Sequence, residues 1–313
     1  MSVVPLVLLM SDPASAAEVF EGHSFYLGDV HVHTGASGDG GSTDVGSCPG
    51  ACGAVADLKL RARENGLDFI TITDHVNGTP AAVPEDFAHV WETALDLDSP
   101  EEGFVVIPGA EVWFSLPGGQ ILGHRTLMLF GSSEDLSATP MTALQPLGDT
   151  RTEMPDCASI WSWSASLESA VGPLLLFPHH PATKLPSGTD WSCHDPAWAP
   201  VVEVYSEHGN SDLEVTDFDP PTTVSPAGTV AHAMAPSGLG YRLGFVGGTD
   251  SHGTDPGGVC TRDTVRTSQP YGGGLTIAVL PESTKFSRAA IYDAMVEGQT
   301  YVTSGPLIPV RVT

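Results

Sequence analysis

Basic residues are scarce in this chain of 313 residues. Lys and Arg together number 12, only three of them lysines, against 38 Asp and Glu, so the formal net charge is −26. Such an acidic surface repels a phosphate backbone, which argues against nucleic acid as a general partner. Two explanations of the acidity stay open: a high-salt or secreted habitat, or a protein that binds cations.

Long hydrophobic runs are also absent. The apolar run at residues 3–10 is too short to span a bilayer, and we expect no membrane span elsewhere. "ASA" at 14–16 suits a signal-peptidase site, although the basic residues that usually precede the apolar run are missing. We expect residues 1–16 to be a signal peptide or a disordered tail and residues 17–313 to form a single domain. The expected location is secreted or periplasmic, otherwise cytoplasmic.

Cysteines are few, and none belongs to the candidate ligands described below. The five are Cys48, Cys52, Cys157, Cys193 and Cys260. "CPGAC" closes a short loop that could hold a disulfide in an exported protein, or its thiols could be free. A zinc site there would lack a nearby second pair of ligands.

The order of apolar segments indicates an α/β fold. Seven short runs rich in β-branched and aromatic residues predict buried strands at 24–33, 67–75, 103–114, 124–131, 172–182, 200–210 and 242–253. Helices are expected within 53–66, 84–97, 158–171 and 287–299, and surface loops over the site at 132–157 and 211–240. Alternating strands and helices favour parallel β/α units, so we expect a distorted seven-stranded (β/α) barrel with its site at the carboxyl ends of the strands.

Residues that can bind metal end most of these runs. "DVHVH" puts His31 and His33 on one face of a strand, where two imidazoles could bind one divalent cation. A single pair of histidines at this spacing could also lie on the surface by coincidence. Seven of the twelve histidines fall at such positions, however, and Glu111 lies in an apolar run where a buried carboxylate needs a partner charge or a metal.

Five motifs together resemble a known family. "DVHVHT", "ITDH", "IPGAE", "HHP" and "GTDSH" occur in the order seen in the PHP superfamily, named for polymerase and histidinol phosphatase domains, over about residues 24–255. The tail "AAIYDAMVEGQTYVTSGP" is similar to the end of a largely uncharacterised bacterial branch. The resemblance implies a distorted seven-stranded barrel of PHP type, a cluster of up to three divalent metals, and phosphoester hydrolysis.

The resemblance also implies a set of metal ligands, one group for each cation. The groups are His31, His33, Glu111 and Asp250; Glu111, His124 and His180; and Asp39, His75 and His252. Asp39 stands where many members have a histidine. His180 is preferred over His179 because of the family's "HP" pair, but strand alternation gives the two opposite faces, so which one faces the metals stays open.

Roles beyond metal binding can be assigned to a few residues. Catalytic roles fall to three of the ligands, Glu111, Asp250 and His252. Weaker candidates for substrate contacts are Arg125, His179 and His208. Arg125 follows a ligand and could grip a phosphate, or it could form an ion pair.

For other polar residues in these runs, a structural role is an alternative to a role at the metal site. Asp29 and Asp74 could each orient an imidazole, or hold a strand start and cap a turn. Glu203 could lie in the barrel interior, hydrogen-bonded and without a chemical role. We expect no part in the chemistry for His23, His89, His194 and His232.

Mixed imidazole and carboxylate ligation suits Zn²⁺, Mn²⁺ or Fe²⁺ better than Mg²⁺ or Ca²⁺. We expect two to three such ions, with a hydroxide that bridges two of them attacking a small phosphorylated substrate. Two other functions stay open: hydrolysis of a non-phosphate bond, as in amidohydrolase barrels, and a non-catalytic module that binds metal or ligand. Amidohydrolases usually use a carbamylated lysine or a bridging carboxylate, and Lys59, Lys184 and Lys285 do not end a strand-like run.

Overall fold

The computed structural model describes most of the chain. The described residues are 17–34, 58–76, 85–139, 141–144, 147, 152–184, 188–214, 223–252, 256–257, 273–304 and 307–310. The expected signal peptide or tail at 1–16, the candidate ligand Asp39 and the Cys48–Cys52 pair lie outside these residues. These three expectations therefore stay predictions.

Each of the seven runs predicted as strands contains one. The strands are β1 (Glu18–Phe20), β2 (His23–Val32), β3 (Phe69–Ile72), β4 (Val105–Leu116), β5 (Gln120–Leu129), β6 (Thr152–Glu153), β7 (Leu174–Pro178), β8 (Val201–Ser206), β9 (Gly209–Asn210), β10 (Gly244–Gly247), β11 (Leu275–Pro281) and β12 (Thr300–Thr303). The α-helices are α1 (Leu58–Glu64), α2 (Glu85–Leu97), α3 (Ser133–Ala138), α4 (Cys157–Val171), α5 (Val230–Met234) and α6 (Arg288–Val296). Short 3₁₀ helices are η2 (Pro100–Glu102), η3 (Met141–Leu144), η4 (Trp191–Cys193) and η5 (Pro226–Gly228).

The main sheet mixes parallel and antiparallel strands. Its order is β12-β11-β2-β3-β4-β5-β7, with β1 paired to β2 and β6 to β4. β2, β3 and β4 are parallel, whereas β5 is antiparallel to both β4 and β7, and β11 is antiparallel to β2. The expectation of parallel β/α units throughout is therefore wrong at β5, which is joined to β4 by a hairpin.

The hairpin has a simple local cause. Between β4 and β5 the sequence reads "PGG", and Gly118 and Gly119 both have a φ of 86°. Positive φ values suit glycine and allow the chain to reverse within a few residues. A helical crossover cannot fit into so short a connection.

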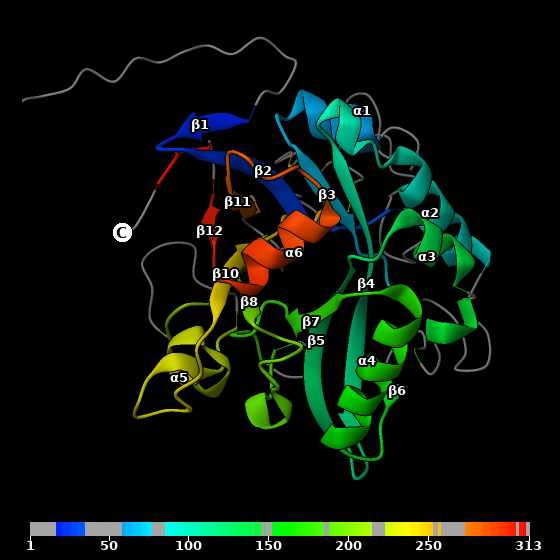
Figure 1. Ribbon diagram of the computed structural model, residues 1–313. Coiled ribbons are helices and arrows are strands. Elements are labelled where there is room, and N and C mark those ends of the chain that lie inside the picture. The colour runs from blue at the N-terminus through cyan, green and yellow to red at the C-terminus, as the bar shows by residue number, and fades with distance from the viewer. Residues whose placement is uncertain are drawn as a thin grey trace, which may run out of the picture.

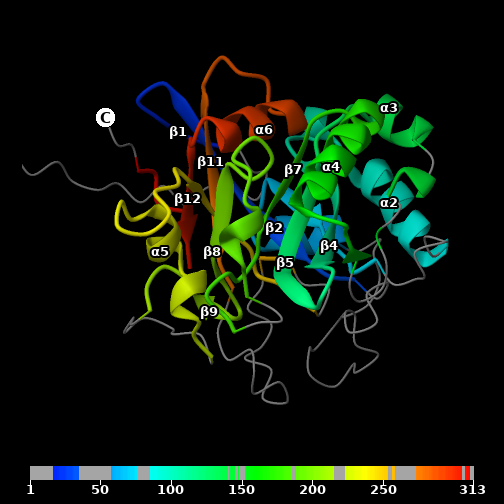
Figure 2. The same cartoon turned by 90° about the horizontal axis from the view of Figure 1, so that it is seen from below.

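A second sheet completes a curled half-barrel. Its order is β10-β8-β9, and β8 lies beside β7 of the main sheet (Figures 1 and 2). No ladder joins β7 to β8 among the described residues, so a closed seven-stranded barrel is not confirmed. The architecture is a mixed α/β fold with a curled sheet.

The concave side of the curled sheet is filled by one apolar core. β3, β5, β7 and β8 contribute Phe69, Met128, Phe177 and Val201. Helix α6 packs into the same core through buried residues that include Ile291 and lies across the sheet in Figure 1. α6 thus covers the inner face at a place where the strands carry apolar side chains.

Two further cores lie on the convex side. α4 packs against β4, β5 and β7 through Ile160 and Leu167, which meet Leu127 and Leu176 of the sheet. α1 and α2 cover β2, β3 and β11 in the other core. Residues on neighbouring positions of β5 thus belong to opposite faces, Met128 inside and Leu127 outside.

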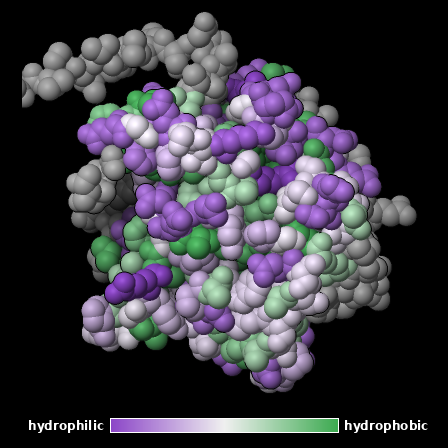
Figure 3. Space-filling view, viewed as in Figure 1, coloured by the Kyte–Doolittle hydropathy of each residue, from purple (hydrophilic) through white to green (hydrophobic). Residues whose placement is uncertain are grey.

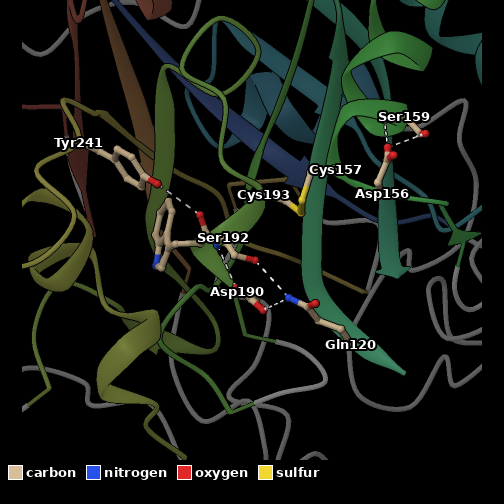
Figure 4. Close-up of a disulfide and its surroundings, with 9 residues drawn as sticks. Gln120, Asp156, Cys157, Ser159, Asp190, Ser192, Cys193 and Tyr241 are labelled. Carbon is tan, nitrogen blue, oxygen red and sulfur yellow. Dashed lines mark hydrogen bonds between the residues drawn. A yellow bond between two sulfur atoms is a disulfide. The ribbon is translucent and has the colours of Figure 1, made fainter. Parts of the chain in front are cut away.

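A disulfide joins two segments that the sequence did not pair. Cys157 begins α4 and Cys193 ends η4, and their Cα atoms are 5.3 Å apart (Figure 4). Nearby, Gln120 at the start of β5 donates a hydrogen bond to Asp190 at 2.8 Å. The bridge and this hydrogen bond attach the 188–194 segment to α4 and β5.

Hydrophilic and hydrophobic residues are interspersed over the surface seen in Figure 3. The helices of the described residues are all too short or too polar to cross a membrane. Residues 132–157 and 211–240, expected to be loops, contain α3, η3, β6, η5 and α5 among their described parts.

Candidate metal centre

A β-bulge near the end of β2 directs two histidines to the concave side. Asp29 lies opposite Ile70 of β3, and Val32 lies opposite Ile72, so β2 carries one extra residue between these pairs. A bulge re-aims the side chains that follow it. Val32 then packs in an outer core, and His31 and His33 are both fully buried with their Nε2 atoms 3.1 Å apart.

Two carboxylates meet these imidazoles. Glu111 Oε2 of β4 lies 3.2 Å from Nε2 of both His31 and His33. Asp250 Oδ1, which follows β10, lies 3.1 Å from His33 Nε2 and 3.5 Å from His31 Nε2. We call these four side chains the central group. The structure therefore brings together the first set of ligands that the resemblance implies.

Glu111 also belongs to a second set. Its Oε1 is hydrogen-bonded to Nδ1 of His124, and Glu111, His124 and His180 offer ligand atoms within 4.8 Å of one another. Because β5 runs antiparallel to β4, its ligand lies near its beginning, where His124 is opposite Trp113. The indole of Trp113 stacks on the His124 ring with 3.8 Å between centroids.

The third set is partly visible. His33, His75 and His252 offer ligand atoms within 4.8 Å of one another, and Asp39 lies outside the described residues. Glu207, which sequence reasoning missed, forms a further group of this kind with Asp250 and His252. Its signal was available, since it follows the apolar run that becomes β8.

His179 and His180 both face the cluster. His180 has a φ of 29°, a left-handed value that is uncommon for a residue other than glycine. This twist breaks the alternation expected after β7, so that His180 reaches Glu111 while His179 Nε2 lies 3.2 Å from Asp250 Oδ2. His208 Nε2 lies 2.9 Å from the same oxygen.

Burial and charge together set the ionisation of the carboxylates. Burial raises the pKa of Glu111, but the facing imidazoles, His75 first, outweigh it and hold that pKa well below its usual value. Burial also raises the pKa of Asp250, but His31 and His179 outweigh it and hold that pKa well below its usual range. Both groups are therefore anionic at neutral pH.

The imidazoles separate into two classes. Burial and neighbouring imidazoles lower the pKa of His33 and lower that of His180 further. Burial lowers the pKa of His124 to about 4 against the attraction of Glu111. Burial also disfavours the charged forms of His31 and His179, but facing carboxylates outweigh it: the pKa of His31 is raised well above its usual value and that of His179 to about 9.

Asp29 and Asp74 hold backbone in place. Asp29 accepts hydrogen bonds from the backbone N–H groups of His31 at 3.1 Å and Thr249 at 2.9 Å. Asp74 accepts from the backbone N–H of Thr34 at 2.6 Å and from its hydroxyl at 2.7 Å. None of these four hydrogen bonds reaches an imidazole, and each holds a segment from which ligands extend.

Arg125 is not brought to the cluster. It follows His124 on β5 and projects from the opposite face, where its guanidinium carbon lies 5.7 Å from the centre of the Trp161 ring. The side chain is fully buried, and its three guanidinium nitrogens have no hydrogen-bond partner among the described residues. Burial lowers its pKa to about 10, opposed by the charge of Asp190.

The cluster fits divalent cations. Such ions bind imidazole nitrogen and carboxylate oxygen at about 2.0–2.2 Å, so ligands of one ion lie about 3–3.5 Å apart. The central group shows this spacing, with contacts of 3.1–3.5 Å. Three buried atoms of the cluster lack a hydrogen-bond partner among the described residues: His124 Nε2, His179 Nε2 and Asp250 Oδ1.

Comparison with known proteins supports the fold. Neither the protein-family models nor the curated proteins contain a match to this sequence. Among solved structures, a two-domain protein from Bacteroides vulgatus, described as containing a predicted PHP-like metal-dependent phosphoesterase, is 17% identical with a TM-score of 0.51. The match covers 94% of this chain and 69% of that chain. The predicted resemblance to the PHP superfamily is thus confirmed at the level of the fold, and the chain carries a cluster of His, Asp and Glu side chains that could bind metal.

Proposed function

We propose that this protein is a metal-dependent phosphoesterase that hydrolyses a small phosphate ester at a centre of two or three divalent cations. The observation that carries this proposal is the convergence of the central group. Its four side chains come from the end of β2, from β4 and from the segment after β10, and their contacts have the spacing of ligands around one metal ion. Buried side chains of this kind are costly to assemble unless their charges are compensated.

The ligands divide between the cations as the resemblance implies. The central group would hold the first ion, and Glu111 would be shared with a second ion completed by His124 and His180. His75 and His252 would hold the third, with a carboxylate from Asp39 or Glu207. Zn²⁺, Mn²⁺ and Fe²⁺ suit this mixture of imidazole and carboxylate.

The open side of the cluster indicates where substrate binds. The side chains of His31, His33 and Asp250 are at most 2% exposed. Those of His75, His208 and His252 are 15%, 21% and 12% exposed, which makes them the rim of the site. His208 and His252 would therefore contact the phosphoryl group or the leaving group. Bound divalent cations would supply an activated water and positive charge for the phosphoryl oxygens.

The lysine chemistry of amidohydrolases finds no support here. Lys184 and Lys285 are exposed, and Lys59 is hydrogen-bonded to Ser99 at 2.5 Å and Glu102 at 2.6 Å. A carbamylated lysine in the cluster is therefore not part of the proposal.

The disulfide between Cys157 and Cys193 supports a secreted or periplasmic location, because such bonds persist in oxidising compartments.

The test is hydrolysis of a panel of phosphomonoesters and phosphodiesters by metal-replete protein. We expect turnover that chelation abolishes and added metal restores. His31→Asn should abolish it, while His23→Asn on the same strand, away from the cluster, should leave it unchanged. Activity only on carboxylic esters or amides would overturn the phosphoesterase class. A full metal complement without any turnover would favour a binding module.

A further inference from the structure

Glu203 of β8 is buried against two imidazoles of the cluster. Its Oε1 lies 2.6 Å from Nδ1 of His179, and its Oε2 lies 3.3 Å from Nδ1 of His31. All three side chains have no exposed surface. A carboxylate this deep is tolerated because it accepts hydrogen bonds from charged or polar partners.

The two contacts fix which ring nitrogen donates a hydrogen bond to Glu203. Each carboxylate oxygen of Glu203 faces one ring nitrogen, so in each contact the Nδ1–H group donates and the carboxylate oxygen accepts. Thr126 Oγ1, 3.2 Å from Nδ1 of His31, can accept from the same proton.

The opposite nitrogens then face the cluster. His31 Nε2 lies 3.2 Å from Glu111 Oε2, and His179 Nε2 lies 3.2 Å from Asp250 Oδ2. With Nδ1 occupied by the hydrogen bond to Glu203, Nε2 is the atom of each ring that can bind a cation, which would displace the proton on Nε2.

The rings have little freedom to turn away. A methyl group added at Gly248 would lie 2.5 Å from His31 Cβ and 3.1 Å from Glu203 Oε2, so backbone closes directly over this pair. On the other side, the His31 and His179 rings lie 3.9 Å apart between centroids. The packing holds the three side chains in one arrangement.

We propose that Glu203 is the positioning residue of the metal centre, and that its carboxylate orients His31 and His179 together with Nε2 toward the cations. This inference rests on the proposed metal centre for its consequence, but the hydrogen bonds themselves exist with or without metal. It also adds His179 to the side chains that face a cation. One buried carboxylate thereby sets the orientation of imidazoles that come from β2 and from the segment after β7.

The test uses two variants of the full chain. Glu203→Gln keeps the size of the side chain but replaces one acceptor oxygen by a donor, so only one imidazole can keep its hydrogen bond. Glu203→Asp keeps the charge on a shorter stem. Asp68→Asn is the control, since Asp68 is a buried carboxylate bonded to the backbone N–H of Leu27.

Imidazole NMR of the metal-free protein is the first measurement. We expect two Nδ1–H protons, assigned to His31 and His179, that exchange slowly and are shifted downfield in the wild type. At least one should be lost in Glu203→Gln, and both should persist in Asp68→Asn. Absence of both signals in the wild type would overturn the inference, whatever the protein binds.

Metal affinity is the second measurement, by calorimetric titration of the metal-free proteins with Zn²⁺. Loss of a carboxylate that orients a ligating histidine typically weakens binding by about 10–100-fold. We expect that loss in Glu203→Gln, part of it recovered in Glu203→Asp, and none of it in Asp68→Asn. Unchanged affinity in Glu203→Gln would contradict a positioning role. A wild type that binds no metal would instead overturn the proposed function and leave the NMR result to decide the hydrogen bonds.

Discussion

At the scale of single residues, two carboxylates organise the candidate metal centre. Glu111 lies within 3.6 Å of His31, His33 and His75 and is hydrogen-bonded to His124. Asp250 contacts the other side of the same cluster and has a φ of 57°. Strained backbone of this kind occurs where the surroundings hold a functional side chain in place.

The anionic ligand of the third cation can be identified by comparing Asp39 and Glu207. Asp39 is the prediction from the motifs, whereas Glu207 Oε1 lies 3.2 Å from Nδ1 of His252. Replacing the true ligand by its amide should cost the protein one ion per chain. The same variant should lose on the order of 10²–10³ in rate, the usual cost of a lost charge stabiliser. Metal analysis and kinetics of Asp39→Asn and Glu207→Gln decide between them. If both variants keep every ion, neither carboxylate is a ligand.

Arg125→Met should stabilise the protein. The substitution replaces a fully buried guanidinium that lacks hydrogen-bond partners among the described residues with an apolar chain of similar length. An unsatisfied buried group costs about 1–3 kcal/mol, partly offset by the cation–π contact with Trp161. We expect urea denaturation to show a free energy of unfolding higher by about 1 kcal/mol, with kcat/KM unchanged. A large rise in KM would show instead that Arg125 contacts substrate.

His194 should make the metal-free protein sensitive to acid. Burial and the charge of Arg125 lower its pKa to about 4, against about 6.5 in the unfolded chain. Between these values the unfolded state binds more protons, so stability falls as the pH falls through this window. His194→Phe should therefore show a shallower fall in melting temperature from pH 6.5 to 4 than the wild type. His232→Phe, at an exposed position, is the control, and equal slopes in all three proteins would contradict the account.

At the scale of elements, the Cys157–Cys193 bridge connects α4 to η4 across a sequence separation of 36 residues. By loop entropy, closing a loop of this length stabilises the fold by about 3–4 kcal/mol. The double variant Cys157→Ala/Cys193→Ala should lose about that amount in urea denaturation. Wild-type protein kept in a reductant should behave like the variant. If neither treatment changes the midpoint, the two cysteines are not bridged in solution.

The strands and the residues at their ends could be predicted because their signals are local. Apolar runs predicted β2, β3 and β7, through β-branched residues in β2 and β3 and through leucines and Phe177 in β7, and the histidines at their ends reach the cluster. The direction of β5 departs from the pattern of alternating strands and helices, because "PGG" reverses the chain directly after β4 and leaves no room for a helix. The bulge in β2 and the left-handed φ of His180 depend on long-range packing, and no local pattern marks them.

The pairing of cysteines could not be predicted for a related reason. Spacing along the chain says little about which thiols meet, since Cys157 and Cys193 come together only when α4 and η4 pack beside β5. For Glu203 the sequence suggested a hydrogen-bonded place in the barrel interior, which the structure shows, but not which side chains it meets. Its two imidazole partners lie 172 and 24 residues away in sequence, and only the curled sheet brings them together.

At the scale of the whole molecule, the formal net charge of −26 agrees with the proposal that the protein binds cations. Bound cations would offset part of that charge and would concentrate positive potential where a phosphate ester must bind. The fold provides the arrangement, since a curled sheet closes on one side around apolar residues and presents the His, Asp and Glu cluster at its strand ends.

The measurement that tests this account most directly is the metal content of the protein after metal-replete expression, for the wild type and Glu111→Gln. Glu111 contacts both the central group and His124, so loss of its charge should release both ions that it would share. Elemental analysis should find two to three transition-metal ions per chain in the wild type and fewer than one in the variant. Glu282→Gln, at an exposed position, should match the wild type. Fewer than one ion in the wild type, or an unchanged content in Glu111→Gln, would contradict the metal centre.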